Sequence, residues 1–240
     1  MASTAILSPH RDDAVLSCWH ALTQPAEVAV VNVFAGTPNG SVADAWWDRL
    51  TAGADPVERM RERADEDRAA LARAGREPTD LPFLDQQYRD REQSLDDIVA
   101  LLQDHVPVGA RLLAPAALGG HLDHQLVRTA ALELGAAGHE VALYADVPHA
   151  TAYGWPAWVT GEPGASALDV DAYWDFHLRK SGLSLGDLEP ELHRLEPADR
   201  ERKEAAVRTY RTQFAALDRP FGLLTHPDVL RFEVVWRVQA

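Results

Sequence analysis

Short runs of apolar residues alternate along the chain with longer stretches whose apolar residues recur at helical spacing. The run VAVVNVF at residues 28–34 is rich in β-branched side chains, which is typical of a strand buried on both faces of a sheet. Shorter runs predict further strands. Together the predicted strands lie at residues 4–7, 28–34, 81–84, 111–114, 140–144 and 232–238.

Helices are predicted between most of these strands. A strongly charged stretch begins at Pro56 and continues to Ala74, with Gly75 as its C-terminal stop. The predicted helices cover residues 14–22, 56–74, 94–103, 123–137 and 200–217. Alternating strands and helices predict an α/β fold of three layers, in which helices cover both faces of a mainly parallel, Rossmann-like sheet.

The last third of the chain departs from this alternation. Residues 146–165 hold prolines, glycines and aromatic side chains, which predicts a long loop that lines a site. The sequence has neither an internal repeat nor a convincing boundary, so we expect a single domain over residues 1–240 with an irregular C-terminal region. Four tryptophans in predicted loops either stack on a ligand or fill the core: Trp46, Trp47, Trp155 and Trp158.

Charge and composition restrict the possible partners. The chain carries 23 basic and 37 acidic residues, a net charge of −14, which argues against non-specific binding to nucleic acid or to an anionic membrane. No stretch approaches the roughly 18 uninterrupted apolar residues of a membrane span. The N-terminal MASTAILSPHRDD lacks the basic and apolar segments of a signal peptide. Cys18, the single cysteine, excludes an internal disulfide, so we expect a cytoplasmic protein.

Histidines and aspartates follow two of the predicted strands. SPHRDD comes directly after the first strand, and GGHLDH follows the strand at residues 111–114. The carboxyl ends of strands in a doubly wound sheet lie along one edge, so two such loops converge there. The two motifs contain His10, Asp12, Asp13, His121, Asp123 and His124.

Each of these residues also has an ordinary structural interpretation. Asp12 or Asp13, taken alone, is most simply the cap of the following helix. His121 and His124 are equally compatible with capping or surface positions of the next helix. Two such motifs after two strands are much less frequent by chance, which favours a metal site. In that interpretation two histidines and one aspartate bind zinc, and a remaining carboxylate acts as a general base.

HRDDAVLS and HLDH resemble the paired motifs of the PIG-L/LmbE-like zinc-dependent N-deacetylases, usually written His-x-Asp-Asp and His-x-x-His. Weaker matches, such as LYADVPHA at residues 143–150, extend the resemblance over most of the chain. The resemblance implies that His10, Asp13 and His124 bind one Zn²⁺ and that Asp12 is the general base. His121 would stabilise the oxyanion or protonate the departing amine.

Further positions take a role from the same resemblance. Arg63 matches a position that contacts the substrate, and Asp85 lies in a region that lines the substrate pocket of relatives. The resemblance gives Asp123 no ligand role, but a carboxylate at this position could orient the ring of a histidine ligand. Arg11 stands where many members have proline, and Ala14 replaces a frequent glutamate. A guanidinium at Arg11 would either favour an anionic substrate or face solvent, and we expect the second.

Other candidates share no motif. His149 and His226 either reach the rim of the site or lie in solvent, which is the usual place of a loop histidine. Cys18 is expected to be a small buried side chain of the first helix.

The resemblance implies a hydrolase that removes an N-acyl group, most simply N-acetyl, from an amino sugar or an amino-sugar-containing metabolite. Two alternatives stay open: an amidase acting on a thiol conjugate or a glycopeptide-type secondary metabolite, and a non-catalytic binding module with the same fold. A nucleotide-binding oxidoreductase is disfavoured because no GxGxxG follows the first strand. The ligand types are also compatible with a divalent metal other than zinc.

Overall fold

A computed structural model describes residues 3–40, 45–53, 55–162, 168–180, 182–184, 186, 188–219 and 222–238. Its strands are β1 (Thr4–Ser8), β2 (Val28–Asn32), β3 (Pro78–Asp80), β4 (Arg111–Pro115), β5 (Val141–Tyr144), β6 (Leu188–Arg194) and β7 (Phe232–Val238). They form a seven-stranded sheet in the order β3-β2-β1-β4-β5-β7-β6. The first five are parallel, whereas β7 pairs antiparallel with β5 and β6.

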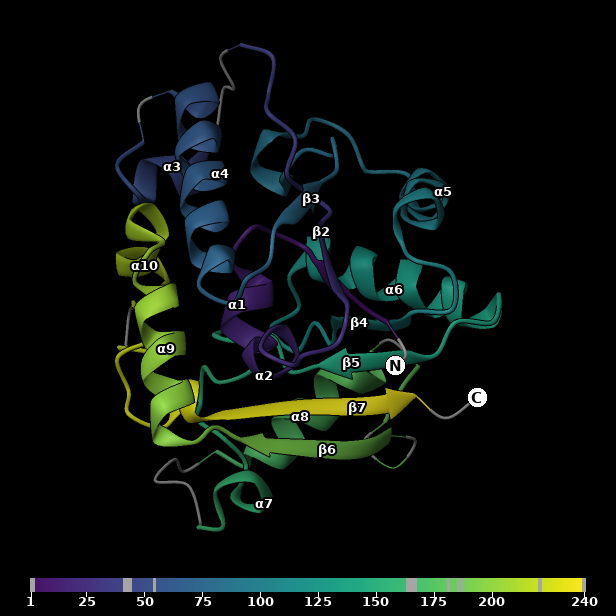
Figure 1. The fold of residues 1–240 in the computed structure, drawn as a ribbon, viewed down its shortest axis with the longest axis vertical. Helices are drawn as coiled ribbons and strands as arrows, with labels where there is room; N and C mark the ends of the chain where they lie inside the picture. Colours follow the sequence, from purple (N-terminus) through teal and green to yellow (C-terminus); the bar gives the residue numbers. More distant parts are fainter. Residues whose placement is uncertain are drawn as a thin grey trace.

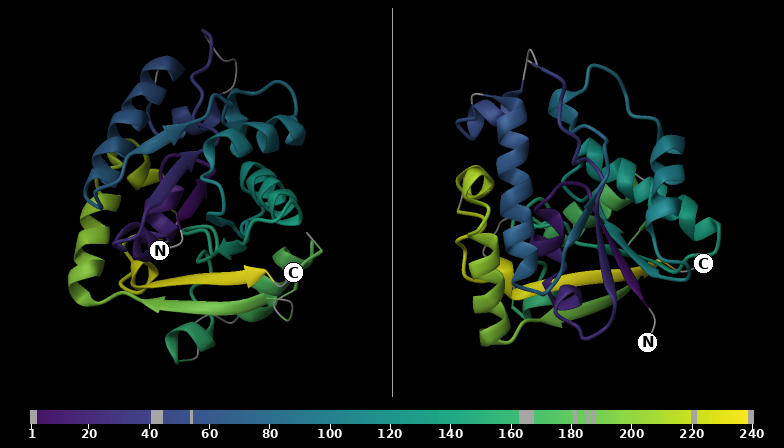
Figure 2. Two further views of the ribbon diagram at one scale, coloured as in Figure 1. Left: turned by 45° about the vertical axis from the view of Figure 1, so that its right-hand side comes forward. Right: turned by 45° about the horizontal axis from the view of Figure 1, so that its top comes forward.

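Helices lie on both faces of this sheet (Figure 1). They are α1 (Asp13–Ser17), α2 (Trp19–Leu22), α3 (Trp46–Leu50), α4 (Pro56–Ala72), α5 (Leu95–His105), α6 (Leu122–Ala136), α7 (Ala157–Thr160), α8 (Val170–Arg179), α9 (Pro197–Val207) and α10 (Arg211–Leu217). The views in Figure 2 agree that α4, α9 and α10 lie together on one side and that α5 and α6 lie on the other. The predicted fold class is confirmed.

The central position of β1 explains why the two motifs meet. β1 lies between β2 and β4 and is parallel to both, and its Ala5, Ile6 and Leu7 are fully buried. Because parallel neighbours end at the same edge, the chain after β1 and the chain after β4 emerge side by side. The first opens α1 and the second opens α6.

Two predicted helices are broken where side chains take over backbone hydrogen bonds. The predicted helix at 14–22 is divided into α1 and α2, and the carboxylate of Glu233 accepts the N–H groups of Trp19 and His20 at the break. The predicted helix at 200–217 is divided into α9 and α10 before Tyr210, whose ψ of 59° is not helical. Both breaks depend on partners that are distant in sequence.

The prediction was also wrong at several short elements. The strand predicted at 81–84 lies at Pro78–Asp80, and β6 was not predicted because its sequence LEPELHR is largely polar. β6 is an edge strand in which only Leu188 is buried, so it needs few apolar residues. The predicted loop at 146–165 contains α7, and its residues 163–165 lie outside the described residues.

Three of the tryptophans placed in loops stand in helices, Trp46 and Trp47 in α3 and Trp158 in α7. Cys18 is buried as expected. Of the helices in the described part of the chain, none combines the length and apolarity that crossing a bilayer requires.

Candidate active site

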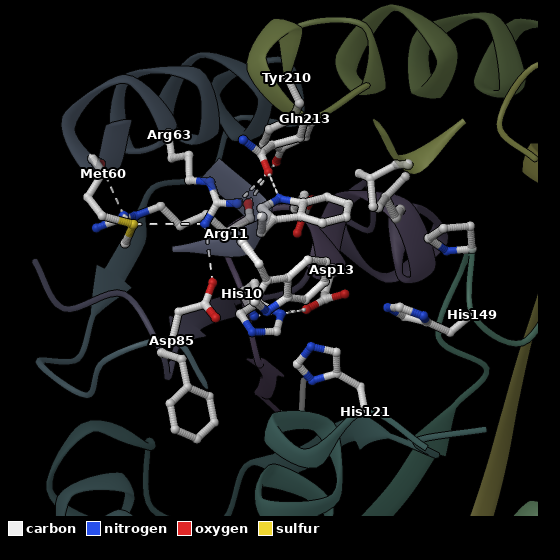
Figure 3. A pocket seen from close by; sticks show the side chains of 17 residues that line it. His10, Arg11, Asp13, Met60, Arg63, Asp85, His121, His149, Tyr210 and Gln213 are labelled. Carbon is white, nitrogen blue, oxygen red and sulfur yellow. Dashed lines mark hydrogen bonds and ion pairs between the residues drawn. The ribbon is translucent and has the colours of Figure 1, made fainter. Parts of the chain in front are cut away.

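A cavity of about 110 Å³ lies beside the loop after β1 and the start of α6. The first motif lines it with His10, Asp12 and Asp13, and the second motif contributes His121. Figure 3 shows His10, Asp13 and His121 gathered at the centre of the cavity, with His149 facing them from one side. The convergence expected from the sheet topology is therefore observed.

His10, Asp13 and His124 offer ligand atoms that all lie within 4.8 Å of one another. Asp13 Oδ2 is 3.4 Å from His10 Nδ1 and 3.4 Å from His124 Nε2. Among the described residues, His124 Nε2 is buried and has no hydrogen-bond partner. A buried polar nitrogen without a partner is costly, and a divalent cation between these three donors would satisfy it. The residues therefore fit a metal ion.

Each of the two histidines has one ring nitrogen in contact with a carboxylate outside the group of three ligands. His10 Nε2 is 3.1 Å from Asp123 Oδ2, and His124 Nδ1 is 3.0 Å from Asp146 Oδ2. Such pairs fix the tautomer and the ring orientation of a metal-binding histidine. Asp123 lies where the sequence predicted a carboxylate behind a histidine, whereas Asp146 was not recognised.

His10 also belongs to a second group, with His121 and Asp123, whose ligand atoms lie within 4.8 Å. In that group Asp123 already accepts hydrogen bonds from the Gln86 backbone and from Arg89, and it contacts His10 directly. The group built on Asp13 and His124 keeps an unpaired nitrogen. It is therefore the better place for a cation.

Asp12 occupies the N-cap position of α1, but its side chain makes no capping hydrogen bond. The capping interpretation of this residue is therefore wrong. Burial and the neighbouring Asp13 carboxylate raise the pKa of Asp12 to about 6. A carboxylate with a pKa close to neutrality is well suited to accept a proton from water and to return it.

His121 does cap a helix. Its Nδ1 accepts the backbone N–H of Asp123 at 3.2 Å, at the start of α6. Burial and the nearby His10 and His124 lower the pKa of His121 to about 3, so the ring is neutral. Because Nδ1 accepts a hydrogen bond, the proton of the neutral ring resides on Nε2. His121 is thus a hydrogen-bond donor at the cavity.

His149 lines the cavity, although the sequence favoured a solvated loop histidine. Its ring centroid is 5.1 Å from that of His124 and 5.8 Å from that of His121. A Cβ on Gly119 would lie 2.5 Å from the Cβ of His149, so glycine is needed there. The motif GGHLDH contains this glycine, but the sequence does not show that His149 is the side chain that packs against it.

Arg63 and Asp85 lie together on another wall of the cavity (Figure 3). Arg63 Nη1 is 3.2 Å from Asp85 Oδ2, and its Nη2 donates to Gln213 Oε1 at 2.5 Å. Burial alone would raise the pKa of Asp85, but the nearby positive charges of His10 and Arg63 outweigh burial, so the pKa is lowered. The two residues expected at the substrate side are therefore neighbours, and Gln213 joins them.

Arg11 neither faces solvent nor offers an unpaired charge, which corrects both interpretations of the sequence. It is only 8% exposed. Its Nη2 lies 2.9 Å from Asp80 Oδ2 and donates to the Ala35 carbonyl at 2.7 Å, and Nη1 donates to the Met60 carbonyl at 3.2 Å. The Arg11 carbonyl accepts the Tyr210 hydroxyl at 3.0 Å. These bonds fix the loop that carries His10, Asp12 and Asp13.

Comparisons with known proteins agree with this geometry. Residues 5–134 match the family model described as PIG-L, GlcNAc-PI de-N-acetylase. The chain is 32% identical over 165 residues to the 2'-N-acetylparomamine deacetylase of Streptomyces fradiae, and the match covers 61% of this chain. It spans 57% of that relative's length.

Two solved structures extend the similarity over the whole chain. Dbv21, the pseudoaglycone deacetylase of an antimicrobial reagent, is 28% identical with a TM-score of 0.70, covering 98% of this chain and 96% of Dbv21. The zinc-inhibited form of teicoplanin deacetylase Orf2 has a TM-score of 0.73 at 24% identity, covering 99% of this chain and 98% of Orf2. At that identity the likeness is one of fold.

Proposed function

Because the chain belongs to the PIG-L (GlcNAc-PI de-N-acetylase) family, we propose that it is a zinc-dependent deacetylase that removes the N-acetyl group of an amino sugar carried by a small metabolite. The family match confirms the resemblance found in HRDD and HLDH. The observation that carries the proposal is the buried group of His10, Asp13 and His124, with Asp12 and His121 in the same cavity. The relatives' names, which mention paromamine and a pseudoaglycone, support an amino-sugar-containing substrate.

His10, Asp13 and His124 would hold the metal, and their two nitrogens and one carboxylate suit zinc. When bound, the ion supplies Lewis acidity towards an acyl carbonyl and towards water. Asp123 and Asp146 keep the two histidine rings in the orientation that ligation requires, through the hydrogen bonds described above.

The remaining groups move the proton and stabilise the charge. Asp12 takes the proton of the attacking water and passes it to the amine nitrogen as the C–N bond breaks. His121 Nε2–H donates a hydrogen bond to the oxygen that becomes negatively charged when water adds to the amide. Arg63 and Asp85 have the donor and acceptor atoms that sugar hydroxyls need, and they orient the ring.

We further propose that the chain acts as one domain in the cytoplasm on a small-molecule substrate. The single buried cysteine and the net charge of −14 support this assignment.

Metal content and acetate release test the proposal together. The wild type and Asp12→Asn should each carry about one zinc per chain, and His124→Ala should carry none, as measured by elemental mass spectrometry. Acetate release from N-acetyl amino sugars should fall by about 10²–10⁴-fold in Asp12→Asn. A fully active Asp12→Asn variant would show that another group is the base. Absence of zinc from the wild type at neutral pH would favour a binding module.

A further inference from the structure

The short helix α3 places two neighbouring tryptophans on the wall of the cavity. Trp46 and Trp47 both line it, and their rings meet edge to face with centroids 5.5 Å apart. Trp46 is 51% exposed, although an indole is among the side chains that gain most from burial. Its exposure at a cavity lined by catalytic groups indicates a contact with a ligand rather than with the core.

Trp47 is tied to the substrate side of the cavity. Its Nε1 donates to Gln213 Oε1 at 2.5 Å, and the same oxygen accepts Arg63 Nη2 at 2.5 Å. Gln213 is buried and its amide nitrogen donates to Thr212 Oγ1 at 2.8 Å, so its orientation is fixed. The indole of Trp47 and the guanidinium of Arg63 are therefore held in one fixed arrangement.

A buried carboxylate holds α3 in place. Asp48 is 2% exposed and accepts the Tyr88 hydroxyl at 2.6 Å, and its backbone N–H donates to Gln87 Oε1 at 3.1 Å. A helix as short as Trp46–Leu50 has no stability of its own, so these bonds and the Trp47 bond hold it. Burying a carboxylate is costly unless it is hydrogen-bonded, so the bonds to Asp48 stabilise α3 and with it the backbone that carries Trp46 and Trp47. A rigid aromatic surface binds with little loss of entropy.

We propose that Trp46 and Trp47 form a subsite for an apolar, ring-containing aglycone attached to the amino sugar. This substrate class deepens the proposed deacetylase function and rests on it. The sugar hydroxyls would be served by Arg63 and Asp85, whereas the indole faces offer no hydrogen-bond acceptor. The Asp85 carboxylate is already paired with Arg63, and the Asp48 carboxylate is buried and accepts the Tyr88 hydroxyl, so neither is free to bind a charged group of the aglycone.

Two substrates that differ only in the aglycone test the subsite. N-acetylglucosamine and its 4-nitrophenyl β-glycoside would be compared by acetate release in the wild type, Trp46→Ala, Trp46→Phe and Leu50→Ala. Leu50 is a matched control because it lies on α3, is half exposed and does not line the cavity. Trp46→Ala should raise KM for the aryl glycoside about tenfold, and it should change KM for N-acetylglucosamine less than about twofold. Trp46→Phe should retain most of the aryl preference, and Leu50→Ala should resemble the wild type.

An equal loss on both substrates would overturn the proposal in favour of contact with the sugar itself. Unchanged kinetics of Trp46→Ala on both substrates would overturn the subsite, because the exposed indole of Trp46 would then bind no part of either compound. If the wild type cleaves neither compound, the proposed function fails separately from the subsite. Calorimetric binding of the aryl glycoside to Asp12→Asn, with and without Trp46→Ala, then decides the subsite: about tenfold weaker binding upholds it, and equal binding refutes it.

Discussion

Replacing Arg11 with methionine should destabilise the protein strongly, although Asp80 is the only charged group within ion-pair distance of Arg11 in the described part of the chain. The substitution retains an apolar stem of similar length and removes the guanidinium. It thereby takes donors from three acceptors: the Asp80 carboxylate and the carbonyls of Ala35 and Met60. The loop between His10 and Asp13 loses the side chain that fixes it to the rest of the fold.

The loss of folding free energy depends on whether each of the three acceptors keeps another hydrogen-bond donor or gains water. Breaking a buried ion pair from one side costs about 3–5 kcal/mol. The Asp80 side chain is 30% exposed and keeps the Asn32 amide at 2.8 Å, so its share falls to about 1–2 kcal/mol. Each carbonyl left without its donor adds about 1 kcal/mol. The sum is about 3–4 kcal/mol, a large part of the roughly 5–15 kcal/mol that stabilises a typical domain.

Urea unfolding of the metal-free protein, followed by circular dichroism, measures this loss. With an m-value of about 3 kcal/mol per M, the midpoint should fall by about 1 M. Arg61→Met on the exposed face of α4 is the control and should stay within about 0.5 kcal/mol of the wild type. An equally small effect of Arg11→Met would refute the reasoning. It would mean that water replaces the guanidinium without cost.

Three further predictions concern the surroundings of the site. Asp146→Asn should weaken zinc binding about 10–100-fold in chelator competition, because His124 Nδ1 loses its carboxylate; unchanged affinity would argue against this role. Gly119→Ala should push His149 into the cavity and reduce turnover roughly tenfold or more while zinc content stays the same; full activity would contradict it. Burial raises the pKa of Asp67 to about 8, so this carboxyl should contribute a slope in which stability falls as pH rises from about 4 to 8, by up to about 1.4 kcal/mol per unit. Asp67→Asn should remove that slope in urea unfolding at several pH values, and an identical slope in both proteins would exclude Asp67 as its source.

The parallel half of the fold is predictable because its information is local. The β-branched run of β2 and the apolar residues of β1 identify buried strands without reference to any other segment. β6 and the break before Tyr210 are different. A polar edge strand is recognised only from its pairing with β7. At the helix break, the Tyr210 hydroxyl hydrogen-bonds with Asp67 and with the Arg11 carbonyl, both far away in the sequence. Such long-range hydrogen bonds leave no periodicity in the sequence.

The same distinction divides the candidate site. His10, Asp13 and His124 stand in short motifs, and topology alone brings those motifs together. Asp146 and His149 lie in the segment LYADVPHA, which resembles the family, but nothing in that segment indicates which side chain each would face. Their roles depend on the rings of His121 and His124, which are reached only after the sheet is assembled.

The boundary of the family match points to a division of labour within the cavity. The match ends at residue 134 and includes every ligand and acid–base group of the proposed mechanism. Tyr210 and Gln213 come from beyond it and still line the same cavity. Tyr210 holds the catalytic loop through the Arg11 carbonyl, while Gln213 holds Arg63 and Trp47 on the substrate side. Since the proposed ligands and acid–base groups all lie in the matched part, changes around Gln213 can alter which substrate is accepted without replacing any of them. The α10 segment is therefore where differences in substrate among related deacetylases of this fold should be sought.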